Sequence, residues 1–291
     1  MKRVALYCLL FYCYVSNSQI NLVTPSTSPA LRFTENIGQW DEFIRFRAQL
    51  DGGWLYMESG GLTYSLYDKR KYRAYHRGGI ARYKDKSIGA HCVKVEFVGA
   101  NKNAIVESFI KGEDYENFFL GNDKSKWKSH VNNFHKIVYR NLYEGIDYEA
   151  VTTANGIKYN FYVKPGSDDA KIKLKYIGAD QIKLIKGELV IVTSIDSVLE
   201  KRPYAYQQIN NKIVEVPCKF VLEGSVVSFA FPKGYNKNYE LIIDPILIFA
   251  AQSGSTADNF GMTATYDNAG NLIAGGTVFN IGYPTTPGAY S

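Results

Sequence analysis

Residues 146–163 read Ile-Asp-Tyr-Glu-Ala-Val-Thr-Thr-Ala-Asn-Gly-Ile-Lys-Tyr-Asn-Phe-Tyr-Val, and this stretch decides the fold class. Asn155-Gly156 stands between two runs rich in aromatic and β-branched residues. Asn-Gly is the strongest short signal for a β-hairpin, because both central residues of a type I′ turn need a positive φ. Residues 159–163 place an apolar side chain at every second position, as in a strand with one buried face. The stretch therefore predicts two antiparallel strands joined by a tight turn.

The same two signals recur along most of the chain. Residues 93–97 and 172–176 alternate between apolar and polar positions. Glycine-containing turns separate further alternating runs at 51–53, 186–187 and 223–224. Short, regularly spaced strands of this kind favour an all-β protein built as an antiparallel β-sandwich region. Only residues 113–133 have a pattern that suits a helical turn or two.

The first 18 residues have the order of a secretory signal peptide. Lys2 and Arg3 give a positive start, residues 4–15 are apolar, and Ser16 and Ser18 occupy the positions that a signal peptidase reads. An apolar run of about 12 residues is too short to cross a bilayer, which needs about 20. We therefore predict a secreted or cell-surface protein, cleaved after residue 18, with no transmembrane segment in the mature chain.

Changes in composition divide the rest of the chain. Polar turn residues at 124–133 indicate a first boundary. Pro245 indicates a second, because proline cannot donate to the ladder of a central strand. We expect a first β-sandwich subdomain over 19–133, a second over 134–246 and a different unit over 247–291.

The net charge of +6 is concentrated in residues 68–89, which hold eight basic and two acidic residues. We expect an exposed basic loop here, in which tyrosines are interleaved with cations. Such a charge run is usually a solvated loop, although it would also suit an anionic partner. A nucleic-acid binder would carry its positive charge more widely, so we expect no nucleic acid as partner. The candidate binding residues of this loop are Arg70, Arg73, Arg77 and Arg82.

Two cysteines remain after the signal peptide. Cys92 shares its strand face with Lys94, whereas Cys218 shares its face with Phe220. Export permits a disulfide between them. Because the two side chains are expected to point to differently solvated faces, the pattern disfavours this pairing.

The sequence contains no motif of a hydrolase serine, a zinc site or a phosphate-binding loop. Asp147 and Glu149 share one strand face, and paired carboxylates can act as acid and base in glycoside hydrolysis. The polar face of a half-buried strand explains the same pair. Oxygen donors between Asp258 and Asn271 would suit calcium, but they are also ordinary turn residues. We therefore predict no catalytic residue, no cofactor and no metal site, with calcium as the alternative.

Three tryptophans are the other candidate binding residues. Trp40, Trp54 and Trp127, with the many tyrosines, would form a stacking platform for a glycan if they were exposed on one face. A sandwich of this size also needs large residues in its core. The sequence leaves both interpretations open.

The C-terminal residues resemble a known repeat. They read Gly-Ser-Thr-Ala-Asp-Asn-Phe-Gly at 254–261, Asp-Asn-Ala-Gly-Asn-Leu at 267–272, Gly-Gly-Thr at 275–277 and Tyr-Pro-Thr-Thr-Pro-Gly-Ala-Tyr at 283–290. This order resembles one SBBP repeat, a β-propeller blade repeat of bacterial surface proteins. The resemblance implies an incomplete propeller blade over 247–291, with a polar loop at 254–261 and strands at 262–266 and 271–275. A lone blade cannot close a propeller, so we expect a fragment, a truncated gene or a chain that a partner completes.

The upstream residues resemble the uncharacterised β-domain that precedes such propellers in large secreted proteins of Bacteroidetes. The matching motifs lie at 33–40, 119–123, 127, 141–147, 164–166, 203–207 and 243–245. The resemblance implies export, often by the type IX route, with further propeller blades and a C-terminal sorting domain.

These observations predict a non-catalytic secreted or cell-surface protein. It would be a structural or adhesion-type module that supports a β-propeller, with surface proteins or glycans as partners. Two alternatives remain open at this point. One is a carbohydrate-binding module that uses Trp40, Trp54 and Trp127, and the other is a glycoside hydrolase built around Asp147 or Glu149.

Overall fold

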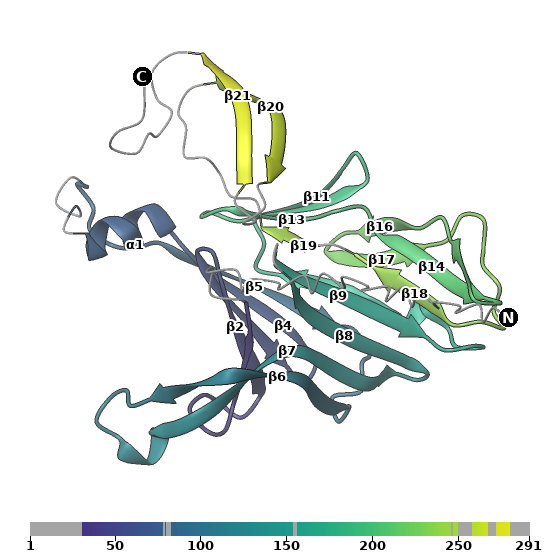
Figure 1. Ribbon diagram of the computed structural model, residues 1–291, viewed down its shortest axis with the longest axis horizontal. Helices are drawn as coiled ribbons and strands as arrows, with labels where there is room; N and C mark the ends of the chain where they lie inside the picture. The colour runs from purple at the N-terminus through teal and green to yellow at the C-terminus, as the bar shows by residue number, and fades with distance from the viewer. Residues whose placement is uncertain are drawn as a thin grey trace, which may run out of the picture. The chain divides into compact units, whose positions relative to one another are not determined.

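The computed structural model describes residues 31–77, 79, 83–153 and 156–245, and the backbone of strands at 247–249, 258–266 and 272–279. Contacts separate a main body from the strand pair within 258–279, and each is described by itself. Both consist mostly of β-strands in antiparallel sheets, which confirms the all-β class (Figure 1). The predicted signal peptide lies outside the described residues.

One 15-stranded sheet makes up most of the body. Its strands are β1 (Phe33–Glu35), β2 (Ile44–Leu50), β3 (Gly53–Glu58), β4 (Gly61–Tyr67), β5 (Ala90–Phe97), β6 (Ile105–Phe118), β7 (Lys128–Tyr143), β8 (Ile146–Thr153), β9 (Gly156–Val163), β10 (Leu174–Ile177), β14 (Tyr204–Ile209), β15 (Lys212–Glu215), β16 (Lys219–Glu223), β17 (Val226–Ala230) and β18 (Leu241–Asp244). A second sheet has the order β11 (Gln181–Ile185), β12 (Glu188–Val192), β13 (Ser197–Glu200) and β19 (Leu247–Phe249). The helical elements are α1 (Lys69–His76), η2 (Lys124–Lys126) and η3 (Asp169–Lys171).

Strand β7 joins two halves of the large sheet. Its first part pairs with β1, at Phe134↔Phe33, and its second part pairs with β8, at Lys136↔Val151. One half therefore continues from β1 through β2–β5 to β10, β17 and β16, and the other from β8 through β9 and β18 to β14 and β15. Strand β6 follows the opposite edge of β7, and Figure 1 shows this long hairpin running out past the neighbouring strands.

The core lies between the two halves of the sheet. Phe97 of β5 packs on Tyr148 of β8, with ring centroids 5.2 Å apart. Phe161 of β9 packs on Phe229 of β17, with centroids 6.0 Å apart. Because strands distant in the sheet meet through these rings, the sheet curves back on itself and buries its inner face. Leu189 and Ile191 of β12 belong to the same core, so the second sheet packs against it.

The alternating patterns predict the buried faces correctly. Val93, Val95 and Phe97 of β5 are buried, as are the alternating apolar residues Tyr159, Phe161 and Val163 of β9 and Leu174 and Tyr176 of β10. β8 pairs with β9 as the Asn-Gly signal predicts, with Tyr148 opposite Phe161. Asn155 of that turn lies outside the described residues. Cys92 is exposed and Cys218 half-buried, and both thiols are free, in agreement with the predicted faces.

The basic segment differs from the loop that its composition predicts. Residues 69–76 form helix α1, and the Asp68 side chain caps it by accepting hydrogen bonds from the N–H groups of Arg70 and Lys71. A capping aspartate with no glycine or proline in the following eight residues is enough to favour a helix over a loop. None of the eight residues is buried, so the segment is exposed as expected.

Residues 113–133 are also different from the prediction. Strands β6 and β7 occupy most of this region, and only η2 is helical. β6 pairs with β7 over most of its length, and this long-range ladder outweighs the weak local helical pattern. The expected domain boundary at 133 falls inside β7, and one hydrogen-bonded sheet contains strands from both sides of it, since β10 pairs with β5.

The C-terminal unit is a strand pair. β20 (Asp258–Tyr266) and β21 (Leu272–Phe279) are antiparallel, with a register shift between Gly261 and Thr263. Two strands are predicted here, but β20 begins at residue 258, inside the segment predicted as a polar loop. The repeat-like motif at 283–290 lies outside the described residues.

Within the residues that the structure describes, the helices are too short and too polar to cross a membrane.

Candidate functional site

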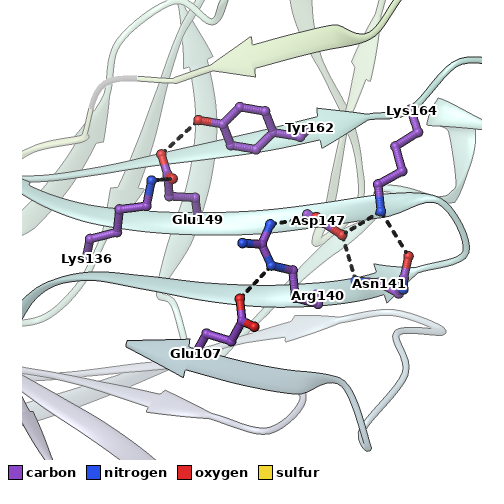
Figure 2. A network of polar contacts seen from close by, with 8 residues as sticks. All are labelled: Glu107, Lys136, Arg140, Asn141, Asp147, Glu149, Tyr162 and Lys164. Atoms are coloured by element: carbon purple, nitrogen blue, oxygen red, sulfur yellow. Dashed lines mark hydrogen bonds and ion pairs between the residues drawn. The ribbon is translucent and has the colours of Figure 1, made fainter. Parts of the chain in front are cut away.

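The predicted carboxylate pair lies on one face of β8, and both side chains are buried. Asp147 accepts hydrogen bonds from the guanidinium of Arg140 at 3.1 Å, the N–H of Asn141 at 2.8 Å and the ammonium of Lys164 at 3.3 Å. Arg140 also donates to Glu107 of β6 at 2.7 Å. Figure 2 shows these side chains converging from neighbouring strands on the carboxylate of Asp147.

Glu149 has a separate set of partners on the same face. It forms an ion pair with Lys136 of β7 and accepts hydrogen bonds from the Tyr162 hydroxyl at 2.9 Å and the Asn160 amide at 3.0 Å. Each carboxylate of the pair is thus held by at least one cation and two further donors, and Figure 2 shows these contacts apart from that of Asn160.

These partners keep both carboxylates ionised. Burial by itself raises the pKa of Asp147, but the Asn141 N–H, Arg140 and Lys164 together lower it below its usual value. Burial likewise raises the pKa of Glu149, but hydrogen bonds from Lys136 and Tyr162 outweigh this effect and the pKa is lowered overall. Glycoside hydrolysis needs one carboxyl group that stays protonated until it donates its proton. The pKa of neither carboxyl group of this pair is raised as that role requires.

The network connects two of the sequence motifs. Asn141 adopts a positive φ of 48°, and the bond from its N–H to Asp147 holds this bend at the end of β7. Lys164, from the Lys-Pro-Gly motif after β9, donates to Asp147 and also to the Asn141 amide oxygen at 3.3 Å. Gly145 takes a φ of 69° against Ser167, where a Cβ atom would collide with the serine hydroxyl. Asp147 therefore serves to hold β7, β8 and the end of β9 in register.

A groove of about 640 Å³ lies near this region but does not contain the pair. Its lining includes Glu144, Asp168 and Lys171, and Glu144 and Lys171 form an ion pair at 2.7 Å. The carboxylates of Asp147 and Glu149 face their own cations, outside this lining.

Trp40 and Trp54 come together around an arginine that sequence analysis did not select. The guanidinium carbon of Arg47 lies 4.2 Å from the Trp40 ring centroid and 3.9 Å from that of Trp54. Phe118 packs on Trp40 with centroids 5.3 Å apart. Both tryptophans are half-buried, and Arg47 covers a face of each ring by cation–π contact. The structure thus brings two of the three predicted tryptophans together and places Arg47 against one face of each ring.

Asn36 positions Trp40. Its side-chain amide donates to the carbonyl oxygens of Trp40, Asp41 and Ile44, and its side-chain oxygen accepts from the N–H groups of Gly38 and Trp40. The half-buried side chain of Asn36 thus holds the connection between β1 and β2 in shape. The Asn-Ile-Gly sequence was the available signal, since asparagine and glycine are the residues that shape turns.

Trp127 lies apart from the other two tryptophans, at the end of the β6–β7 hairpin. Residues 119–127, called the hairpin tip below, connect these strands. Trp127 packs against Phe119 with centroids 5.7 Å apart, and its indole N–H donates to the Gly121 carbonyl oxygen at 3.2 Å. The exposed fractions are 57% for Phe119, 77% for Leu120 and 37% for Trp127. The tip therefore displays a cluster of large apolar side chains to solvent.

The predicted arginines lie on and after α1. Arg70, Arg73 and Arg77 are exposed, and Arg73 forms an ion pair with Asp51 at 3.1 Å. Arg82 lies outside the described residues. Lys69 and Lys71 are paired with Asp51 and Asp85, so acidic neighbours already offset part of this charge.

In the part of the chain that the structure describes, the His, Cys, Asp and Glu side chains form no group of three that could hold a metal ion. Of the residues predicted between Asp258 and Asn271 as an alternative calcium site, those at 267–271 lie outside that part, and only the backbone is described at 258 and 259.

Residues 33–246 match a family model described as a domain of unknown function, DUF7948. The chain belongs to this family. The DUF7948 domain includes the Asp147 network, the Arg47 stack and the hairpin tip, and its extent agrees with the N-terminal domain of unknown function that the upstream motifs predict. No curated protein and no solved structure gives a significant match.

Proposed function

We propose that this chain is a non-catalytic secreted or cell-surface protein, in which the DUF7948 domain binds surface partners through its hairpin tip. The observation that carries the proposal is the exposure of Phe119, Leu120 and Trp127 together at the end of a long hairpin. Exposed apolar clusters on a folded domain usually mark interaction sites. The buried polar groups have the opposite character, because the Asp147 and Glu149 carboxylates are saturated by internal partners.

We further propose that the domain is a β-sandwich that supports a β-propeller of SBBP-type blades, in a Bacteroidetes protein exported by a signal peptide and the type IX route. Two observations support this part. Residues 1–18 have the signal-peptide order. The antiparallel pair β20–β21 has the strand direction that neighbouring strands of a propeller blade need, and it carries the repeat-like motifs.

The test is binding of the purified chain to the outer surface of its source cells and to a glycan array, at low and at moderate salt. We expect cell-surface binding that Trp127→Ala weakens and that Ile213→Ala, on the exposed strand β15, leaves unchanged. Equal binding by both variants, or no binding by the unaltered chain, would contradict the role of the hairpin tip. Salt-resistant binding to one sugar class, lost in Trp127→Ala, would identify a glycan as the partner.

A further inference from the structure

The chemistry around the hairpin tip indicates what kind of partner it meets. The tip is convex, since it closes the end of a hairpin that runs out past the neighbouring strands (Figure 1). Its most exposed side chain is Leu120, at 77%, and Phe119 follows at 57%. Exposing such side chains to water is unfavourable, so moving the tip into an apolar medium would lower the free energy of the system.

Hydrogen bonds within the tip fix its shape. Asp123 accepts hydrogen bonds from the N–H and the hydroxyl of Ser125, and the indole N–H of Trp127 is bonded to the Gly121 carbonyl oxygen. These bonds hold the turn in shape before any partner arrives, which reduces the entropy lost on binding. They also let Trp127 enter a medium of low polarity without an unpaired donor, a requirement that the interior of a bilayer imposes.

Positive charge borders the apolar cluster. Lys124, Lys126 and Lys128 lie within or directly after the tip, and the Lys124 ammonium is 5.7 Å from the Trp127 ring centroid. The Lys128 ammonium donates to the Ser125 carbonyl oxygen at 3.0 Å, so it stays close to the turn. Asp123 is the only acidic residue among residues 119–128, and the Ser125 bonds engage its carboxylate. Apolar and aromatic side chains bordered by lysines match an acyl-chain boundary beneath anionic headgroups.

We propose that the hairpin tip inserts into the interface of an anionic lipid bilayer, with Phe119, Leu120 and Trp127 in the acyl-chain boundary and the three lysines at the phosphate level. This inference rests on the proposed function and names the partner of the same tip. A protein partner would fit the apolar cluster equally well, but the border of lysines favours the anionic bilayer.

The test is co-sedimentation of the whole chain with vesicles of phosphatidylcholine alone and of phosphatidylcholine mixed with phosphatidylglycerol. We expect binding to the anionic vesicles and a blue shift of tryptophan fluorescence that is absent in Trp127→Phe. The pair Phe119→Ser with Leu120→Ser should weaken binding by about tenfold or more. The pair Lys124→Glu with Lys126→Glu should weaken it by about tenfold or more and reduce its sensitivity to salt.

The matched control is Ile213→Ser with Val214→Ser. It removes two exposed apolar side chains of β15, with exposed fractions of 70% and 44%, at a point distant in the sequence from the tip and its lysines. It should bind as the unaltered chain does, and circular dichroism should show that all variants are folded. Absence of vesicle binding, equal loss in the control, or full competition by soluble glycerol phosphate would overturn the insertion. Tip-dependent binding to cells without vesicle binding would overturn only the lipid inference, whereas loss of both would also remove the proposed function.

Discussion

The face of β8 and the hairpin tip differ in the polarity of the side chains that they bury and expose. β8 buries two carboxylates among cations and hydrogen-bond donors, whereas the tip exposes three large apolar side chains beside lysines. Both regions carry motifs of the family resemblance, at 141–147 for β8 and at 119–123 and 127 for the tip. The difference teaches that a motif residue in this domain can serve either the fold or an interaction. Burial of the residue itself distinguishes the two, since the side chains of Asp147 and Glu149 are buried and those of the tip are exposed.

The largest expected effect is on the buried network. Asp147→Ala removes the acceptor of Arg140, Lys164 and the Asn141 N–H, so we expect it to lower the free energy of unfolding by about 3 kcal/mol. Chemical denaturation measures this change. Glu107→Ala is the control, because it removes an exposed partner of Arg140 and should cost less than about 1 kcal/mol. Similar costs for both would show that burial does not decide the role of Asp147.

A smaller effect is expected at the turn beside this network. Gly145→Ala must adopt a positive φ and also place its Cβ against Ser167, so we expect a loss of about 2 kcal/mol in the free energy of unfolding. Gly99→Ala is a matched control, since Gly99 has nearly the same φ but no atom within 4 Å of the added Cβ. If the two variants are equally destabilised, the contact with Ser167 contributes nothing.

Glu200 sharpens the comparison, because it is a buried carboxylate with a different kind of partner. It accepts hydrogen bonds from the hydroxyls of Tyr159 at 2.6 Å and Tyr176 at 2.7 Å, and burial raises its pKa above the usual 4.5. The unfolded chain therefore releases this proton first. Stability should fall as pH rises from about 4.5 through the raised pKa, by at most about 1.4 kcal/mol per pH unit.

Urea unfolding of Glu200→Gln at several pH values checks this expectation. The amide does not titrate, so the difference in stability between the two proteins should change over that pH range and become constant above it. Asp147 and Glu149 contribute in the opposite sense, since their lowered pKa values remove stability only as pH falls below their usual range. A constant difference at all pH values would show that Glu200 does not titrate as inferred.

The smallest expected effect is at the tip. Leu120→Ser removes an exposed side chain, so the free energy of unfolding should change by less than about 0.5 kcal/mol. Thermal unfolding measures it, with Leu55→Ser in the buried face of β3 as the contrasting variant that should be strongly destabilised. A large loss of stability in Leu120→Ser would mean that the tip is part of the packed structure, contrary to its proposed role.

Much of the fold was predictable because its signals are local. Period-two alternation placed Val93, Val95 and Phe97 on a buried face, and Asn-Gly predicted the β8–β9 hairpin. Helix α1 was missed, although Asp68 gave a capping signal, because the high charge of the segment favoured a loop interpretation. The division of the large sheet was not predictable, since β7 pairs with β1 along its first part and with β8 along its second part.

The candidate site was predictable only in its residue types. The sequence placed Asp147 and Glu149 on one face and selected the three tryptophans, but it did not show that Arg47 lies between Trp40 and Trp54. That contact depends on the connection between β1 and β2, which Asn36 holds in shape. This connection brings Trp40, which lies outside the strands, to Arg47 of β2.

The sequence by itself determined the all-β class, the faces of most strands and the chemistry available on each face. The reason is that every second side chain of a strand points to the same face of the sheet. Only the tertiary structure decided which charges meet and which apolar residues remain in water. Arg140 comes from β7, Asp147 from β8 and Lys164 from the residue after β9, and their meeting depends on register across the sheet. Trp127 stays exposed while Trp54 is half-buried because β6 and β7 run beyond the strands that would cover them, and strand length relative to neighbours is a property of the whole sheet.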